Sequence, residues 1–489
     1  MIIRRGKYAW LSLLALLLAL AVLLPATATA EEGEEQNVHP AVDLFADLFP
    51  GQDVPVIVSS DDADLPLWVI GHGGTVIREF DIIGGFQAEM PIAAIRTLDF
   101  TDGANWISLD APMMVSGRGN DEVDASRLAT VYPFAAGAVP VWDEGITGDG
   151  VTVAVIDSGI NSGSDFSGRI AGFRNFSEAK SSKDENGHGT WVAGIIAGSD
   201  PNGHYVGIAP GADLLSVKVA GRDGSARVGD VIQALQWVVD NKDRYDVQVI
   251  NISLNSAIPD SYLRDPVSAA VEQAWFQGIV VVVSAGNLGG GPLAIDHAPA
   301  NDPYVITVGA FDDNGTAVRS DDQLTTWSSR GVTVDGYAKP EVTAPGVDVV
   351  STYGGPRTYL AQEGSESIVD RDYIRLSGSS ASAAVVSGSV ALMLDEDPSL
   401  TPDEVKFRVM VTGAPMSGSD APGIDAFGAT FTTLAGTANG GALPNEFIDP
   451  ETGMILEESI LWRSILWRSI LWRNILWRNI LWRSILWSR

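Results

Sequence analysis

Apolar runs and amphipathic stretches alternate along the middle of the chain, from about residue 132 to residue 415. Four runs are continuously apolar and short enough to be strands, and two stretches between them, 228–239 and 262–276, have helical spacing. The predicted strands are 151–156, 214–219, 247–254 and 279–285. Apolar strands that alternate with helices indicate a parallel sheet covered on both faces, so the predicted fold class is α/β.

Polar residues stand at the carboxyl ends of these predicted strands. Asp157 ends the first strand, Asn255 ends the third, and Asn287 follows the fourth. Parallel sheets of this kind bind their ligands beyond the carboxyl ends of the strands. We therefore expect a functional site at the edge of the sheet where these three residues lie.

The run LSGSSASAAVVSG at residues 376–388 has two interpretations. Small polar residues are typical of a flexible linker, but apolar positions follow Ser380 at three- and four-residue steps, as on one face of a helix. These positions are Ala383, Val386, Val390 and Leu394. We therefore expect a helix that begins at or beside Ser380, where unpaired backbone N–H groups stabilise negative charge. A serine at this place either caps a buried helix or acts chemically.

The regions that flank the α/β pattern differ from it in composition. At the N-terminus, basic residues precede an apolar run and a small-residue site, the layout of a secretory signal peptide; a retained membrane anchor is the alternative. Strand-like and helix-like runs within 54–113 indicate a compact α+β domain. The predicted organisation is a signal peptide at 1–30, an acidic linker at 31–53, an α+β domain at 54–120, an α/β domain at 128–415, a tether rich in Gly, Ala and Pro at 416–458 and a repeat tail at 459–489.

The tail repeats the pentapeptide SILWR with small variations. A five-residue period turns by about 140° per repeat on a helix and changes face on a strand, so neither form has one apolar side. Arginine in nearly every repeat excludes an ordinary membrane span. Tryptophan with arginine suits an anionic membrane interface or wall polymer, or self-association of β segments. The alternative is a disordered tail that is removed during maturation.

Composition narrows the chemistry that the chain can perform. The 489 residues include no cysteine and carry a formal net charge of −31. The absence of thiols excludes a cysteine nucleophile and thiolate zinc sites. An acidic protein without a basic stripe repels phosphate groups, so we expect no nucleic-acid partner. The acidity also suits a protein that stays soluble at high salt, which we keep as a hypothesis.

One histidine has a glycine-rich setting, although the chain has only five histidines. In NGHGTWVAGIIAG, His188 begins an apolar helix of small residues. Alone, such a histidine is more often structural, and Asp157 is more often a turn former. Together with Ser380 and Asn287, they supply a hydroxyl nucleophile, a base, an orienting carboxylate and an oxyanion donor, as acyl transfer requires. The G-x-S-x-G motif is absent around Ser380, which argues against a lipase or esterase.

The sequence resembles the subtilisin-like serine proteases over nearly all of residues 136–415. VAVIDSGI around Asp157, NGHGTWVAG around His188 and LSGSSASAAVVSG around Ser380 are similar to the three catalytic motifs of that family. The intervening segments VGIAPGADLLSVKV, VINISL, VVVSAGN, PYVITVGAFD, SSRG and KPEVTAPGVDVVST are similar as well. The resemblance implies the subtilisin-like fold, a parallel sheet flanked by helices.

The resemblance also implies roles for individual residues. Ser380 is the nucleophile, His188 the general base and then acid, Asp157 the orienting carboxylate, and Asn287 a donor to the oxyanion. The residues implied in substrate binding are Ser253, Leu254, Asn255, Ser284, Ala285 and Gly286. The chemistry requires no cofactor, and no metal ligand is assigned. Structural calcium is common in the family, and FDDNG at 311–315 offers oxygen ligands; an ordinary acidic turn is the alternative.

Three positions depart from the family pattern. Ala384 stands where the family has proline, and because alanine favours a helix, Ser380 should keep its place. Trp191 replaces a histidine that is not a catalytic residue, and it adds bulk near the site. Asn255 stands where glycine is usual, in the strand that pairs with substrate. We expect its side chain to reshape the groove and alter the substrate preference.

The small domain is similar to the inhibitory propeptide that precedes such catalytic domains. A secreted protease must stay inactive until it has folded and been exported, so we expect a zymogen that cleaves itself between Met113 and Val131. The chain is thus predicted to be a secreted serine endopeptidase that acts on proteins through an acyl-enzyme, with its own propeptide as an intramolecular inhibitor. The alternative is an inactive binding or assembly protein of the same fold, displayed at the cell surface by its tail.

Overall fold

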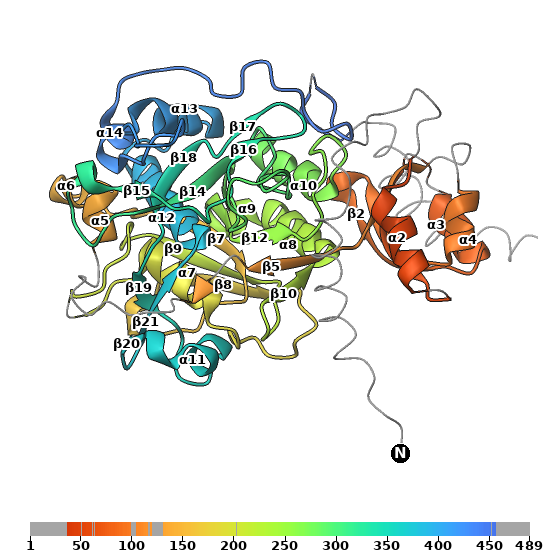
Figure 1. Cartoon of the computed structure of the whole chain (residues 1–489), viewed down its shortest axis with the longest axis horizontal. Coiled ribbons are helices and arrows are strands. Elements are labelled where there is room, and N and C mark those ends of the chain that lie inside the picture. The colour runs from red at the N-terminus through yellow and green to blue at the C-terminus, as the bar shows by residue number, and fades with distance from the viewer. Residues whose placement is uncertain are drawn as a thin grey trace, which may run out of the picture. The chain divides into compact units, whose positions relative to one another are not determined.

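The computed structural model describes residues 37–49, 51–60, 62, 64–98, 104–115, 118–119, 131–201, 203–450 and 452–455. The predicted signal peptide and the repeat tail lie outside these residues. The chain forms two compact units (Figure 1). The described part of the larger unit comprises residues 111–262 and 274–442, and that of the smaller unit comprises residues 37–110, 263–273 and 443–455.

The smaller unit is built on an antiparallel sheet of order β2-β3-β1-β4. Its strands are β1 (Val54–Ser60), β2 (Thr75–Phe80), β3 (Gly85–Met90) and β4 (Ala104–Leu109), and its helices are α2 (Pro40–Leu48), α3 (Leu65–Gly71) and α4 (Ile92–Thr97). β1 lies between β3 and β4, and all of its residues are buried. This alternation of strands and helices agrees with the α+β pattern of the sequence.

A helix occupies the stretch that composition predicts to be an acidic linker. α2 follows His39, whose side chain accepts a hydrogen bond from Ala41 N at 3.1 Å, and Pro40 stands at the first helical position. Val42 and Phe45 are buried, and the helix contacts β1 and β4. Because tertiary packing stabilises this short helix, its local sequence period is a weak signal.

The larger unit contains the predicted α/β fold. Its main sheet has the order β15-β14-β13-β11-β7-β9-β8, with β18 beside β14. The strands are β7 (Thr152–Asp157), β8 (Ile170–Asn175), β9 (Asp213–Lys218), β11 (Val247–Ile252), β13 (Val280–Ser284), β14 (Ile306–Asp312), β15 (Gln323–Leu324) and β18 (Val342–Pro345). All pair in parallel except β15. β7 and β13 are buried along their whole length, which confirms the prediction of a sheet covered on both faces.

Helices flank this sheet (Figure 1). α7 (His188–Ala197) and α12 (Ser379–Glu396) pack against each other, and α12 also contacts β7, β11, β13 and β14. α8 (Val228–Asp240) contacts β7. The other helices of the larger unit are α5 (Tyr132–Ala135), α6 (Val139–Asp143), α9 (Lys242–Tyr245), α11 (Tyr359–Glu363), α13 (Pro402–Thr412) and α14 (Ala426–Phe431). Most of α10 (Pro266–Phe276) belongs to the smaller unit. Across the part of the chain that the structure describes, no helix combines the length and apolarity needed to cross a membrane.

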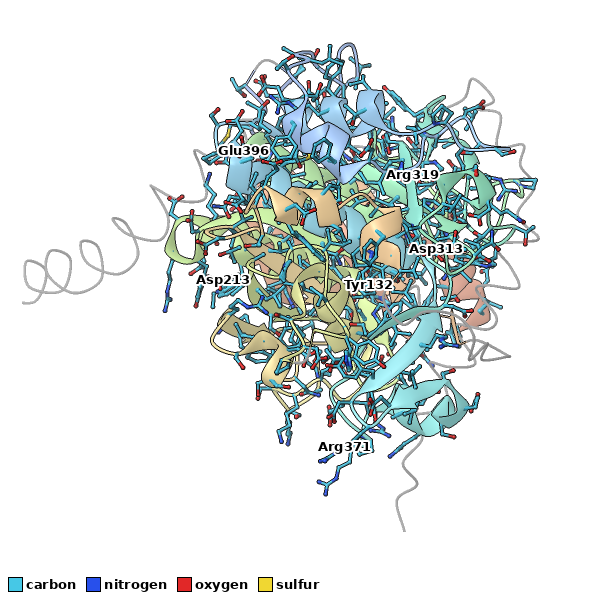
Figure 2. All side chains as sticks on the ribbon, turned by 90° about the vertical axis from the view of Figure 1, so that its left-hand side faces the viewer. Tyr132, Asp213, Asp313, Arg319, Arg371 and Glu396 are labelled. Carbon is cyan, nitrogen blue, oxygen red and sulfur yellow. The ribbon has the colours of Figure 1, made fainter. Side chains whose placement is uncertain are left out.

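Two side chains attach α5 to the rest of the larger unit (Figure 2). Tyr132 donates its hydroxyl hydrogen to Val206 O at 3.1 Å. Arg319 donates from Nε and Nη2 to Ala135 O at 3.1 and 2.8 Å, and its Nη2 also contacts Ile424 O. The first helix of the larger unit is therefore held by residues from two distant parts of the chain, and Arg319 connects it to a third.

The third predicted strand is divided in two. The remaining strands are β5 (Pro112–Val115), β6 (Arg118–Gly119), β10 (Ser225–Arg227), β12 (Leu254–Ser256), β16 (Gly331–Val332), β17 (Ala338–Lys339), β19 (Val349–Thr352), β20 (Ile368–Asp370) and β21 (Tyr373–Ser377). β11 ends before Ser253, and β12 joins a separate sheet in which β5 pairs antiparallel with both β10 and β12. Asn255 therefore lies inside β12 and not at the end of a main-sheet strand.

Two parts of the predicted tether, residues 416–458, are folded. α14 belongs to the larger unit and packs against α12 and α13. In the smaller unit, Asn445 N donates to both carboxylate oxygens of Glu272 at 3.1 and 2.9 Å, and Arg264 pairs with Glu446 at 2.8 Å. These partners are distant in sequence, so the composition of the segment alone does not predict them.

Candidate active site

Asp157 and His188 are joined at the carboxyl edge of the main sheet. Asp157 is the last residue of β7, and His188 is the first residue of α7. His188 Nδ1 lies 2.9 Å from both carboxylate oxygens of Asp157, and both side chains are fully buried. Ser158 N also donates to Asp157 Oδ1, at 2.7 Å. A carboxylate at Nδ1 favours the tautomer with the proton on that nitrogen, so Nε2 is the nitrogen that can accept a proton.

A second buried carboxylate, Asp184, organises the loop before α7. Its two carboxylate oxygens accept hydrogen bonds of 2.6 to 3.1 Å from residues that stand before and after His188 in the chain. The donors are Ser158 Oγ, Asn186 N, Gly187 N, Thr190 N and Thr190 Oγ1. Burial raises the pKa of Asp184, and these hydrogen bonds oppose the rise. Sequence analysis missed this residue, although an aspartate shortly before a helix is a capping signal.

Two neighbours of His188 determine how α7 meets β7. A Cβ atom on Gly189 would lie 2.2 Å from Gly159 O and 3.2 Å from Asp157 Cβ, so only glycine permits this approach. Trp191 is fully buried, and its ring centroid lies 5.8 Å from that of His188. The Trp191 Nε1 donates to the backbone of β19 at 3.2 Å. The Trp191 ring therefore packs beside the His188 ring and is held in place by its hydrogen bond to β19.

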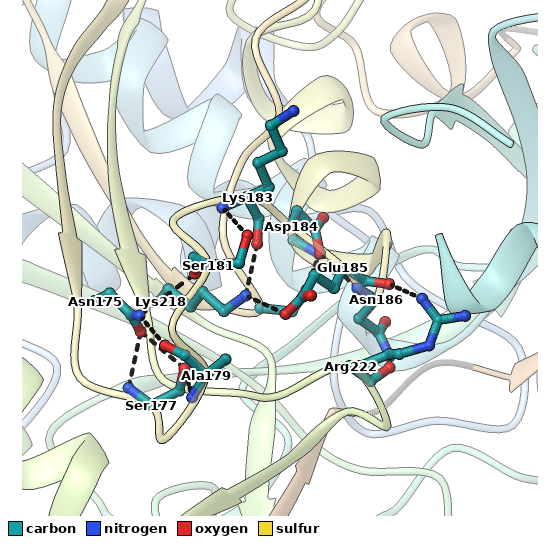
Figure 3. A network of polar contacts seen from close by, with 12 residues as sticks. Asn175, Ser177, Ala179, Ser181, Lys183, Asp184, Glu185, Asn186, Lys218 and Arg222 are labelled. Atoms are coloured by element: carbon teal, nitrogen blue, oxygen red, sulfur yellow. Dashed lines mark hydrogen bonds and ion pairs between the residues drawn. The ribbon is translucent and has the colours of Figure 1, made fainter. Parts of the chain in front are cut away.

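A buried lysine supports the same loop (Figure 3). Lys218 ends β9 and lies opposite Asp157 in the parallel register. Its Nζ donates to Lys183 O at 2.6 Å and lies 3.7 Å from a carboxylate oxygen of Glu185. Burial lowers the pKa of Lys218, and the charges of Asp184 and Glu185 oppose this. The lysine thus fastens the loop before α7 to the edge of the sheet.

Ser380 lies in the first turn of α12, which confirms the predicted start of that helix. Within the described ranges, Ser380 Oγ is buried and makes no hydrogen bond, and the same is true of His188 Nε2. The structure therefore joins Asp157 to His188 but does not join His188 to Ser380 by a hydrogen bond. Catalytic hydrogen bonds are often long in the absence of substrate and shorten when substrate binds.

Asn287 is attached to the same end of α12. Its Oδ1 accepts hydrogen bonds from Ser379 N at 3.1 Å and from Ser379 Oγ at 3.0 Å. Gly286 N also donates to Ser379 Oγ at 3.1 Å. The segment that follows β13 is thus fixed to the residue immediately before Ser380. Two of the predicted site residues, Asn287 and Ser380, are thereby brought to one helix terminus.

The six residues implied in substrate binding come from two segments. They are Ser253, Leu254, Asn255, Ser284, Ala285 and Gly286, and all except the partly exposed Asn255 are buried. Leu254 lies opposite Val115 and Asn255 opposite Met114 in the pairing of β12 with β5. A strand of the chain itself therefore lies along the segment that is predicted to bind substrate.

The acidic loop at 311–315, which the sequence offers as a possible calcium site, forms a turn that its own side chains stabilise. Asp312 Oδ1 accepts from Asn314 N at 2.8 Å, and Asp313 Oδ1 accepts from Gly315 N at 2.9 Å, so both side chains stabilise the turn itself. Among the described residues as a whole, no group of three His, Cys, Asp or Glu side chains is placed to hold a metal ion.

Comparison with known protein families agrees with this geometry. The model of the "Subtilase family" matches residues 148–439. The chain belongs to the subtilase family. The matched part of this subtilase includes Asp157, His188, Asn287 and Ser380, and it extends past the predicted domain end to include α14.

Similar proteins carry protease names. The serine protease AprX of Bacillus subtilis (strain 168) is 42% identical over 269 residues, which are 53% of this chain and 60% of AprX. The thermostable alkaline protease of Halalkalibacterium halodurans is 36% identical over 338 residues, which are 69% of this chain and 80% of that protein. This subtilase thus spans less than two thirds of the length of AprX.

A solved structure shows the same fold. Fervidolysin from Fervidobacterium pennivorans, described as a keratinolytic enzyme related to subtilisin, matches with a TM-score of 0.63 at 23% identity. The match covers 79% of this chain and 62% of the fervidolysin chain. At this identity the likeness establishes the shared α/β architecture.

Proposed function

We propose that this subtilase is a serine endopeptidase that hydrolyses peptide bonds in proteins through an acyl-enzyme. Ser380 is the nucleophile, His188 is the general base and then the general acid, and Asp157 orients the imidazole. The observation that carries the proposal is the contact of His188 Nδ1 with Asp157, which leaves Nε2 as the proton acceptor. The histidine and the serine also stand in the first turns of two helices that pack together.

The chemistry proceeds in two halves. His188 Nε2 takes the hydroxyl proton as Ser380 Oγ attacks the carbonyl carbon, and the negative charge moves to the carbonyl oxygen. Asn287 and the backbone N–H groups at the start of α12 stabilise that oxyanion. His188 then gives the proton to the leaving amine, the C–N bond breaks, and the acyl ester remains on Ser380. Water hydrolyses this ester by the same sequence, and the proton returns to Ser380 Oγ.

We also propose that the chain is a zymogen in which its own N-terminal region blocks the site. The position of β5 supports this, because β5 lies between β10 and β12 and pairs antiparallel with both, as an added substrate strand would. The part of the smaller unit that precedes β5 in the chain, residues 37–110, then acts as an inhibitory propeptide. The basic and apolar N-terminus in the sequence supports secretion of the zymogen.

The two strands that flank residues 116–117 in the chain narrow the proposed self-cleavage site. β5 ends at Val115, and β6 begins at Arg118, which lies opposite Ser377 in β21. Ser377 stands three residues before Ser380 in the chain. We therefore propose that the chain cleaves one of the bonds between Val115 and Arg118, inside the wider interval predicted from the sequence.

Active-site labelling of material that is expressed as the full-length chain and then allowed to mature tests the proposal. A fluorophosphonate probe should label Ser380 in the wild type, and the same material should hydrolyse casein. The Ser380→Ala variant should do neither, and its circular dichroism spectrum and cooperative thermal unfolding should show that it is folded. A folded wild type that takes up no label and cleaves no protein would instead support the alternative, an inactive binding protein of this fold.

A further inference from the structure

Asn255 connects the two segments that are implied in substrate binding. Its Nδ2 donates to Ser284 O at 3.0 Å, and Ser284 Oγ donates to Asn255 Oδ1 at 3.3 Å. A Cβ atom on Gly286 would lie 3.5 Å from the same Oδ1. The side chain therefore reaches from β12 to the backbone of residues 284–286, and we call this arrangement the carboxamide bridge.

The pairing of β5 relates the carboxamide bridge to the proposed reaction. β5 runs antiparallel to β12, so its carboxyl end points toward Ser253. The segment after β13 is attached to Ser379, which precedes Ser380 in the chain: Gly286 N donates to Ser379 Oγ, and Asn287 Oδ1 accepts from Ser379 N. A substrate residue whose carbonyl carbon reaches the serine thus has β12 on one side and the segment after β13 on the other. The carboxamide bridge spans these two sides.

We propose that the carboxamide bridge restricts cleavage to peptide bonds that follow a small residue such as Gly, Ala or Ser. This inference rests on the proposed protease function and adds a substrate class to it. A large apolar side chain would have to displace the carboxamide from Ser284 or remain outside the space that the bridge spans. The chain's own residues between Val115 and Arg118 are small, namely Ser116 and Gly117.

The size of the effect follows from how enzymes discriminate side chains by volume. One extra or missing methylene group of a substrate in a hydrophobic pocket changes kcat/KM by about 10–200-fold. A glycine at position 255 would remove the whole bridge, whereas loss of Ser284 Oγ would remove one of its hydrogen bonds and leave Ser284 O as the acceptor for Asn255 Nδ2. A comparison of Asn255→Gly with Ser284→Ala therefore separates the effect of the volume of the carboxamide bridge from the effect of one of its hydrogen bonds.

The experiment compares two peptide anilides that differ only in the residue before the scissile bond, Ala or Phe. The full-length chain is secreted, and active enzyme is titrated with a fluorophosphonate, so that kcat/KM refers to competent sites. The wild type should favour Ala over Phe by about tenfold or more. Asn255→Gly should raise kcat/KM for Phe by about 10–200-fold and change the Ala value much less. Ser284→Ala, which removes one hydrogen bond of the bridge, should raise the Phe value less than Asn255→Gly does. The matched control is Asn439→Gly, which removes a carboxamide that donates to Tyr304 O at 3.1 Å outside the predicted site residues, and it should keep the wild-type preference.

The outcomes distinguish this inference from the function on which it rests. Absence of titratable Ser380 in the wild type would overturn the proposed function itself. Titratable enzyme that cleaves after Phe as well as after Ala would overturn only the role of the carboxamide bridge, and so would an unchanged ratio in Asn255→Gly. If the glycine variant does not fold, Asn255→Ala makes the same comparison, and the wild-type ratio decides alone if neither variant folds.

Discussion

Removing the charge of Glu341 should destabilise the larger unit strongly. Its carboxylate lies 2.6 Å from Lys339 Nζ and 2.8 Å from Lys406 Nζ, and the exposed fractions of the three side chains are 7%, 1% and 3%. The two ammonium groups also donate to backbone oxygens of residues 302–305 and to Thr307 Oγ1. Burial raises the pKa of Glu341, but the two lysines outweigh it and lower that pKa overall. The Glu341 carboxylate thus pairs with two buried cations at once.

The Glu341→Gln substitution keeps the shape of the side chain and one acceptor oxygen, but it removes the carboxylate that pairs with both ammonium groups and leaves the weaker attraction of Asp302 for Lys339. Removing one partner of a buried ion pair costs about 3–5 kcal/mol of unfolding free energy, because the remaining charge stays desolvated. At about 2–4 °C per kcal/mol, the unfolding midpoint should fall by about 6–20 °C. Adding Lys339→Met should recover part of the loss, since it removes one of the two cations that lose this partner.

Differential scanning calorimetry is the appropriate assay, with every variant made in the Ser380→Ala background so that self-digestion does not contribute. The matched control is Asp372→Asn, because Asp372 and its partner Arg371 have exposed fractions of 68% and 90% and lie 3.9 Å apart. Such an exposed pair contributes little to stability, so the control midpoint should not move. A midpoint change of less than about 2 °C in Glu341→Gln would refute the reasoning.

Three further expectations concern processing, geometry and pH. Ser380→Ala should accumulate as the intact chain, whereas N-terminal sequencing of wild type should find a terminus at residue 116, 117 or 118; equal processing of both would mean that another protease cuts the chain. Gly189→Ala should lower kcat/KM by about 10²-fold or more, because its Cβ displaces α7 from β7. The control Gly163→Ala should leave kcat/KM unchanged, because a Cβ atom there meets open space and the backbone φ of −146° suits any residue. Burial lowers the pKa of Lys339 to about 8. Since the unfolded chain keeps this proton up to about pH 10.4, the folded state should gain stability as pH rises between these values. Midpoints measured from pH 7 to 10 should rise relative to those of Lys339→Met, and parallel curves would contradict the expectation.

The parts of the fold that local sequence encodes could be predicted, and the parts that depend on distant partners could not. The apolar run that ends at Asp157 and the stripe that follows Ser380 each contain enough information to identify a strand and a helix. The break of the third strand at Ser253 depends on pairing with β5, more than a hundred residues earlier. The role of Asp184 likewise depends on donors from two loops that meet only after folding.

The pairing of β5 also determines when the proposed zymogen becomes active. A cut between Val115 and Arg118 leaves all the backbone pairs of β5 intact, and Ala257 N and Val228 N still donate to Pro112 O and Ala111 O at 3.0 and 3.1 Å. A protein substrate adds its strand along the same edges of β10 and β12, so it cannot bind while β5 remains. On the proposed function, the first cut therefore does not release activity. Release requires β5 to leave the edges of β10 and β12.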